Sequence, residues 1–137
     1  MEFVTRFRDL KVYQLSTQLS KEIFELSKRF PKEETYALTD QIRRSSRSIG
    51  AQIAEAWAKR RYEKYFISKL TDAVGELFET EHWLETAENS LYMSKDESGR
   101  LKAEYLILEK MINSMINKST QFCKGFETPN HNGDILA

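Results

Sequence analysis

Apolar residues recur along most of this chain at spacings of three and four, which is the period of one face of an α-helix. Segments with Pro, Gly or N-capping residues separate the apolar stretches from one another. We predict one helix for each stretch, over residues 9–29, 34–59, 62–90 and 94–123. Amphipathic helices joined by short loops predict one all-α domain over residues 1–125, an antiparallel up-down four-helix bundle.

Each predicted helix carries a stripe of residues that we expect to face the core. In the first helix the stripe is Val12, Leu15, Leu19, Ile23, Leu26 and Phe30. In the second it is Leu38, Ile42, Ser45, Ile49, Ile53 and Ala56. In the third it is Phe66, Leu70, Ala73, Leu77, Leu84 and Leu91. In the fourth, where the regular spacing is typical of coiled-coil-like packing, it is Leu101, Tyr105, Leu108, Ile112, Met115, Ser119 and Phe122.

Start and stop signals mark several helix ends. Asp9 is placed to cap the first helix, and Phe30-Pro31 is placed to end it. Ser94 and Glu97 form the pattern of a capping box at the start of the fourth helix. Gly125 is placed to end that helix, and residues 126–137 are predicted to be a disordered tail.

The second helix is unusual on the side opposite its apolar stripe. At about 100° per residue, that side carries arginines alternating with small residues, namely Arg43, Arg44, Arg47, Gly50, Ala51, Ala54, Ala58 and Arg61. A helix that packs on one side only is expected to be polar on the other. We therefore expect a further partner on this face, either nucleic acid, another protein or a second copy of the chain.

The charge distribution changes the picture more than the total charge does. The 137 residues carry no net charge, with 21 basic and 21 acidic side chains. Residues 1–70 hold 15 Lys or Arg and nine Asp or Glu, a net charge of +6, which leaves −6 for residues 71–137. A chain polarised in this way is able to bind an acidic partner through its first half or to bind itself, and both surfaces are equally compatible with simple solvation.

Targeting signals and disulfides are not predicted. The first residues lack an apolar segment of the kind found in secretory signals, and no apolar run approaches the length of a membrane span. Cys123 is the single cysteine, which excludes an intrachain disulfide and fits a reducing compartment. We predict a cytoplasmic protein that does not bind membranes.

Glu79-x-x-His82 is a candidate metal-binding pattern, because Glu-x-x-His supplies ligands in di-iron four-helix bundles. Such a site needs a second pair of this kind, and the other histidine of the chain, His131, lies in the predicted tail. His82 also points about 160° away from the core stripe of its own helix. We predict a surface histidine, with no metal and no other cofactor.

Catalytic residues are not predicted either. No histidine stands out as a base for Cys123, which we expect to be a packing residue or an inert thiol. The carboxylate pairs Asp72/Glu76 and Glu81/Glu85 are expected on outer faces, without the apolar surroundings that raise a carboxyl pKa. No phosphate-binding Gly-rich motif is present. We predict a protein that is not an enzyme.

Basic residues are the better candidates for function. Arginine suits phosphate because its planar guanidinium donates paired hydrogen bonds, and neutralised phosphates release counterions. The local alternative is that Asp40 pairs with Arg43 and Arg44 along the helix. The predicted nucleic-acid contacts are Arg43, Arg44, Arg47, Lys59, Arg60 and Arg61.

Self-assembly accounts for more of the pattern. One flank of the third helix carries acidic and aromatic residues, and its apolar residues Ile67, Val74 and Phe78 spread beyond one stripe. This flank complements the second helix, and two different complementary patches generate head-to-tail contacts that close into a ring when the rotation permits. The alternative is a bundle with broad helix burial. The predicted subunit interface is Gly50, Ala51, Ala54, Asp72, Glu76, Glu79 and Trp83.

Several segments together resemble a known family over nearly all of residues 3–122. They are Phe7-Arg8-Asp9-Leu10, Val12-Tyr13, Phe30-Pro31, Glu34-x-Tyr36-x-Leu38-x-x-Gln41-x-Arg43-Arg44, Ser48-Ile49, Ile53-Ala54-Glu55 and Gly75-Glu76-Leu77-x-Glu79. They resemble the four-helix-bundle proteins encoded in 23S rRNA intervening sequences and the accessory variability proteins of diversity-generating retroelements. Where the family has Ile-Pro, this chain has Ile49-Gly50, and Ala56 replaces a family Gly, so we expect a straighter second helix.

The resemblance implies an up-down four-helix bundle that assembles into a homopentameric ring. It also implies a nucleic-acid-binding role, on RNA or DNA, without catalysis. The accessory variability proteins also bind a reverse transcriptase. The resemblance therefore offers such an enzyme as a partner, which we favour less than nucleic acid. We therefore expect assembly through the first half of the second helix and polyanion contact at its end, from Lys59 to Arg61. The competing hypothesis is a structural oligomer whose arginines are used at subunit interfaces.

Overall fold

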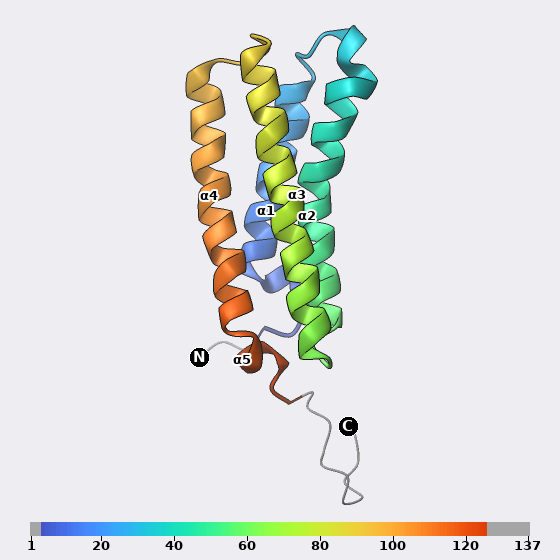
Figure 1. Ribbon diagram of the computed structural model, residues 1–137, viewed down its shortest axis with the longest axis vertical. Coiled ribbons are helices and arrows are strands. Elements are labelled where there is room, and N and C mark those ends of the chain that lie inside the picture. The colour runs from blue at the N-terminus through green and yellow to red at the C-terminus, as the bar shows by residue number, and fades with distance from the viewer. Residues whose placement is uncertain (1–3, 126–137) are drawn as a thin grey trace, which may run out of the picture.

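The computed structural model describes residues 4–125, which form an all-α bundle of four long helices and a short one (Figure 1). The long helices are α1 (Lys11–Ser27), α2 (Asp40–Ala58), α3 (Glu63–Asn89) and α4 (Lys95–Asn117). Successive helices run in opposite directions, and each packs against its neighbours in a closed square, α1 on α2, α2 on α3, α3 on α4 and α4 on α1. The predicted antiparallel four-helix bundle is confirmed.

The short elements lie at the two ends of the bundle (Figure 1). They are the 3₁₀ turns η1 (Phe7–Asp9) and η2 (Lys32–Glu34), the π-helical turn η3 (Thr35–Thr39) and the short helix α5 (Ser119–Cys123). The turn η1, the α2–α3 loop and α5 share one end, whereas η2, η3 and the α3–α4 loop share the other. The predicted tail, residues 126–137, lies outside the described part of the chain.

The core is one continuous cluster that contains most of the predicted stripes. Every position predicted for the stripe of the second helix is buried, from Leu38 in η3 to Ala56 in α2. In α1 the buried surface is rotated toward α2, because Ser16 and Ser27 are buried whereas Leu15 and Leu26 are only partly covered. Small side chains at this seam let α1 and α2 approach closely. Within the described residues, no helix has both the length and the apolar character needed to cross a membrane.

Two predicted helix starts are wrong in detail. Asp9 does not cap α1, because it lies within η1. The residue at the N-cap position of α1 is Leu10, which is buried. The second helix does not begin as an α-helix at residue 34, because residues 32–39 form the η2 and η3 turns and regular α-helix begins at Asp40. The wide π turn places both Leu38 and Thr39 in the interior.

The fourth helix is interrupted at Lys118, where the sequence predicted a helix running on to residue 123. The break turns α5 toward the start of α3, so that Ser119 Oγ donates to Glu63 Oε2 at 2.5 Å. The Phe122 ring stacks on Phe66, with ring centroids 5.8 Å apart. By contrast, the capping box is confirmed, since Ser94 Oγ accepts from Glu97 N and Glu97 Oε1 accepts from Ser94 N.

Leu91 does not belong to the core stripe of the third helix. Its side chain is 89% exposed, and its φ of 65° is in the left-handed region. Tyr92 N donates to the Ala87 carbonyl at 2.9 Å and Leu91 N donates to the Glu88 carbonyl at 3.0 Å, which is the hydrogen-bond pattern of a Schellman motif. Leu91 therefore occupies the position that usually carries glycine, and its side chain is turned out to solvent.

Candidate nucleic-acid interface

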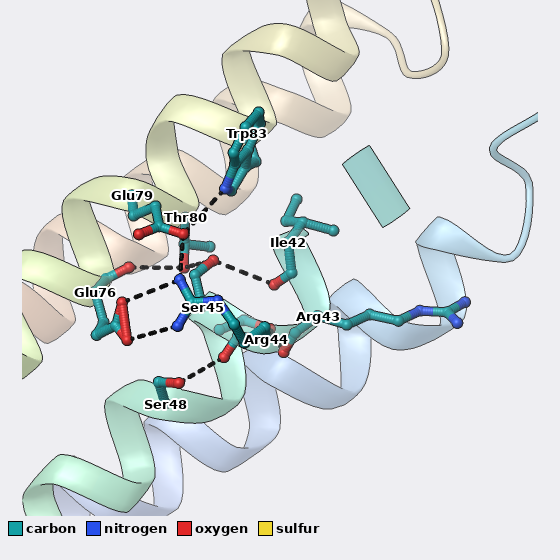
Figure 2. A network of polar contacts seen from close by, with 10 residues as sticks. Ile42, Arg43, Arg44, Ser45, Ser48, Glu76, Glu79, Thr80 and Trp83 are labelled. Carbon is teal, nitrogen blue, oxygen red and sulfur yellow. Dashed lines mark hydrogen bonds and ion pairs between the residues drawn. The ribbon is translucent and has the colours of Figure 1, made fainter. Parts of the chain in front are cut away.

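The arginines that the sequence placed on one face of α2 divide between its two neighbouring helices. Adjacent residues on a helix are about 100° apart, and α2 lies between α1 and α3. Arg44 therefore reaches α3, whereas Arg43 reaches α1 (Figure 2). The partners of both come from neighbouring helices, and the described ion pairs do not include Asp40.

Arg44 joins α2 to α3 through two carboxylates (Figure 2). Its Nη1 lies 3.1 Å from Glu76 Oε2, and its Nη2 binds Glu79 Oε2. Trp83 Nε1 donates to the same Glu79 oxygen at 3.3 Å. Partial burial raises the pKa of Glu79, but the hydrogen bonds from Arg44 and Trp83 outweigh it and the net pKa is lowered. The guanidinium of Arg44 is thus used inside the molecule.

Beneath this ion pair lies a buried polar contact between the same two helices. Thr80 Oγ1 lies 2.8 Å from Ser45 Oγ and also donates to the Glu76 carbonyl at 2.9 Å. Both side chains are fully buried. Ser45 and Thr80 therefore fix the register of α2 against α3, which holds Arg44 opposite its carboxylates.

Arg43 and Arg47 lie over an aromatic ring of α1. Their guanidinium carbons are 4.6 Å and 5.2 Å from the centroid of the Phe24 ring, within cation–π range. Arg43 Nε also donates to Ser27 Oγ at 2.7 Å. Arg43 is partly buried and Arg47 is exposed, so Arg47 is the more accessible of the two.

The predicted interface residues have different positions in the structure. Gly50 is buried against α1, where a Cβ atom would lie 3.2 Å from Ser16 Oγ. Glu76, Glu79 and Trp83 take part in the contacts to Arg44 within the chain. The charge complementarity expected between subunits is thus formed inside one molecule at Arg44. Ala51 and Asp72 are exposed, and Ala54 is partly covered.

A second consequence of the fold is a concentration of positive charge at one end of the bundle. Alternating helix directions bring residues 4–11, 59–64 and 118–125 to that end (Figure 1). Within these segments of the described chain the acidic residues are Asp9 and Glu63. The basic residues, which we call the basic end, are Arg6, Arg8, Lys11, Lys59, Arg60, Arg61, Lys64, Lys118 and Lys124.

Contacts hold the parts of the basic end together. Arg60 packs its guanidinium 3.5 Å from the Trp57 ring centroid, and its Nε donates to the Trp57 carbonyl at 2.8 Å. Arg6 and Ala58 line the same shallow groove, so η1 lies beside the end of α2. Glu63, which follows the loop cations in the sequence, accepts the hydrogen bond from Ser119.

The opposite end of the bundle has no such excess. Residues 28–40 and 89–97 mix Lys28, Arg29, Lys32 and Lys95 with the acids Glu33, Glu34, Asp40, Asp96 and Glu97. Arg29 there pairs with Glu97 at 2.8 Å. The sequence predicted the contacts from Lys59 to Arg61 but not the cations around η1 and α5. Those segments come close to the α2–α3 loop only because the helices alternate in direction.

The other candidate chemistry takes ordinary structural roles. His82 is exposed and packs edge-on against Trp83, with ring centroids 4.7 Å apart. Glu79, its partner in the Glu-x-x-His pattern, is bound by Arg44. Among the described residues, no group of three or more His, Cys, Asp or Glu side chains is arranged to hold a metal. Cys123 is buried, and burial together with the Glu63 charge raises the pKa of its thiol.

Fold and charge together define a small up-down helical bundle with one basic end. The chain belongs to the 23S rRNA-intervening sequence protein family, whose pattern matches residues 8–114. A solved structure of a protein with unknown function from the S23 ribosomal protein family of Bacteroides thetaiotaomicron is 31% identical in sequence. That similarity covers 77% of this chain and 97% of the other, with a TM-score of 0.70. None of the curated proteins compared with the chain matches it.

Proposed function

We propose that this protein is a non-enzymatic nucleic-acid-binding bundle and that the basic end contacts the phosphate backbone. The observation that carries the proposal is the convergence of cations from three separate segments on one end of a molecule with no net charge. A local excess of this kind attracts polyanions even when the whole protein is neutral. The cytoplasmic location predicted from the sequence would give the protein access to RNA.

The contacts that we propose differ from those expected from the sequence. Arg44 is left out, because two carboxylates already bind its guanidinium and partly neutralise it. Lys59, Arg61 and Lys64 form the centre of the proposed surface, since all three side chains are exposed. Binding is expected to depend on phosphate charge and not on base edges, because lysine and arginine side chains on a loop and a helix start suit contacts to the backbone, which carry no sequence information.

The test is a pair of charge-matched variants. Lys59→Gln/Arg61→Gln/Lys64→Gln removes three cations from the basic end, and Lys28→Gln/Lys32→Gln/Lys95→Gln removes three from the opposite end. In fluorescence anisotropy with single-stranded and duplex RNA at low salt, the first variant is expected to lose about tenfold or more in affinity. Its slope of log K against log salt should fall by about two, whereas the second variant should resemble the wild type. Equal losses in both variants, or no binding by the wild type, would refute the proposal.

Self-assembly is a second candidate function, favoured by the open seam between α1 and α2. A shallow groove of about 330 Å³ runs there, lined mainly by small side chains that include Ser16, Thr17, Ala51 and Ala54. On the outer side of α3 and α4, Phe78, Leu106 and Ile107 remain about half exposed, whereas Ile67 and Val74 pack against the core. Exposed apolar side chains and an open groove are features of surfaces that bind protein.

Light scattering tests this second candidate. If the seam is a subunit interface, the wild-type chain should have the mass of an oligomer, and Ala51→Glu should reduce that mass. Ala103→Glu is the matched control, since Ala103 is an exposed alanine of α4. A monomer at both low and high salt would exclude assembly. The ring of five subunits and a reverse transcriptase partner remain predictions from the family resemblance.

A further inference from the structure

Two tyrosines are exposed at the centre of the basic end. Tyr62 is 55% exposed and Tyr65 is 54% exposed, and their rings meet edge to face with centroids 5.7 Å apart. Lys59 Nζ lies 5.7 Å from the centroid of the Tyr65 ring, and Arg61 and Lys64 are neighbours in sequence. Neither ring belongs to the hydrophobic core or to the side chains packed against it, so both rings are accessible to a partner outside the bundle.

The start of α3 fixes the positions of both rings. Tyr62 precedes the helix in an extended conformation, with φ of −124° and ψ of 102°. Its carbonyl accepts hydrogen bonds from Tyr65 N at 2.9 Å and Phe66 N at 3.0 Å. Phe66 is fully buried and stacks on Phe122 of α5. The exposed pair is thus anchored to a rigid part of the fold.

We propose that Tyr62 and Tyr65 stack on unpaired bases of a single-stranded nucleic acid, whose phosphates are bound by Lys59, Arg61 and Lys64. This inference rests on the proposed function and names its substrate class. Proteins that bind single strands combine a basic surface with aromatic side chains, because each base has a face that can stack once it is unpaired. A duplex keeps its bases stacked inside the helix and offers such rings only its backbone.

The opposite end of the bundle supplies a natural contrast. Tyr36 is 82% exposed, which is more than either ring of the pair. It lies on η3, beside Glu33 and Glu34, where acidic charge would repel a phosphate backbone. An exposed tyrosine alone does not therefore favour nucleic acid, and the inference depends on the combination of exposed rings with cations at the α2–α3 loop.

The experiment compares three fluorescein-labelled probes of about 20 nucleotides, namely oligo-dT, the same backbone without bases, and a dT·dA duplex. Wild-type protein should bind oligo-dT at least fivefold more tightly than the base-free strand. Tyr62→Leu/Tyr65→Leu should lose this preference and bind all three probes about as the wild type binds the base-free strand. Tyr62→Phe/Tyr65→Phe should keep the preference, since stacking does not need the hydroxyl. Tyr36→Leu is the matched control and should bind as the wild type does.

The outcomes separate this inference from the function on which it rests. If none of the probes binds at low salt, the proposed function fails. If the wild type binds oligo-dT and the base-free strand equally, nucleic-acid binding stands and the stacking inference is refuted. The wild-type comparison needs no substitution, so the inference remains testable even if the leucine variant is unstable. Tighter binding of the duplex than of oligo-dT would also overturn it.

Discussion

The guanidinium of Arg44 lies between two carboxylates of α3 that would otherwise repel each other. Glu76 and Glu79 are one helical turn apart, with side chains 18% and 35% exposed, so their repulsion is only partly screened by water. Trp83 adds a neutral hydrogen bond to Glu79. Arg44 therefore stabilises the α2–α3 contact, and its charge is already paired with carboxylates of the same chain.

Substituting Arg44 with methionine tests this role through pH. Because the folded protein lowers the pKa of Glu79, its stabilising contribution is present above the unfolded pKa of about 4.3 and is lost as pH falls through the folded value. We expect Arg44→Met to lower the free energy of unfolding at pH 7 by about 0.5–1 kcal/mol, since Arg44 is half exposed. The difference from wild type should shrink below about pH 4.

The matched control is Arg100→Met, which breaks the single exposed pair between Arg100 and Glu22. Urea unfolding at pH 7 and pH 3 measures both variants. The Arg100 variant should change stability less than the Arg44 variant, because it leaves one carboxylate where Arg44→Met leaves two side by side. A loss at Arg44 that is equal at both pH values would show that packing and not charge is responsible.

Leu91 gives an independent prediction from backbone conformation. Placing a residue with a branched side chain in the left-handed region costs roughly 1–2 kcal/mol of stability. Glycine avoids this strain, but it makes the unfolded chain more flexible, so only part of the cost is recovered. The side chain of Leu91 is almost fully exposed, so its removal sacrifices little packing. Leu91→Gly should raise the free energy of unfolding by about 0.5–1 kcal/mol in thermal or urea unfolding. A destabilised variant would contradict the prediction and would show that the added flexibility of the unfolded chain outweighs the relief of the left-handed backbone.

Helix α2 is the central helix of the candidate surfaces, because its two sides serve two different neighbours. Toward α3 it presents Ser45 and Arg44, and toward α1 it presents Gly50 and Arg43. Gly50 permits the close approach of Ser16 and Tyr13 of α1. Helix α3 also has a glycine in its interior, Gly75, but no atom of the described chain would meet a Cβ there within 4 Å.

The two glycines should therefore respond differently to alanine. Alanine is favoured over glycine in a helix interior by about 0.5–1 kcal/mol. Gly75→Ala should gain this amount, because its surroundings are open. Gly50→Ala should gain less or lose stability, because the new Cβ would lie 3.2 Å from Ser16 Oγ and the α1–α2 seam must adjust. Equal gains for both in urea unfolding would show that the seam is loosely packed.

Over the whole molecule, the up-down order of the helices turns the separation of charge along the sequence into a separation of charge in space. The basic first half supplies η1, the start of α1 and the α2–α3 loop to one end, and Lys118 and Lys124, which flank α5, add to the same end. The acids of the second half lie largely along the sides of α3 and α4, where Glu76, Glu79 and Glu88 pair with cations of the same chain. The proposed phosphate surface and the stacking pair both belong to that end.

Much of the fold was predictable because helix periodicity is a local property. The spacing of apolar residues predicted the long helices and most of the core, and Ser94 with Glu97 predicted a cap that the structure confirms. Periodicity failed where a helix end depends on distant contacts. The helix α4 is interrupted at Lys118, where Ser119 and Phe122 pack against α3. Leu91 leaves its stripe because it lies in the Schellman motif that ends α3.

The candidate site divides in the same way. The residue pattern alone placed Lys59, Arg60 and Arg61 at a helix end and set arginine beside small residues on α2. It could not decide which cations remain accessible, since Arg43 and Arg44 are neighbours in sequence yet bind different helices. Nor could it join Tyr62 and Tyr65 to the cations in and around η1 and on either side of α5, because those segments meet only in the folded bundle. Composition and apolar periodicity are properties of short stretches of sequence. The partner of each charged side chain depends instead on the rotation and direction of helices that are far apart in the chain.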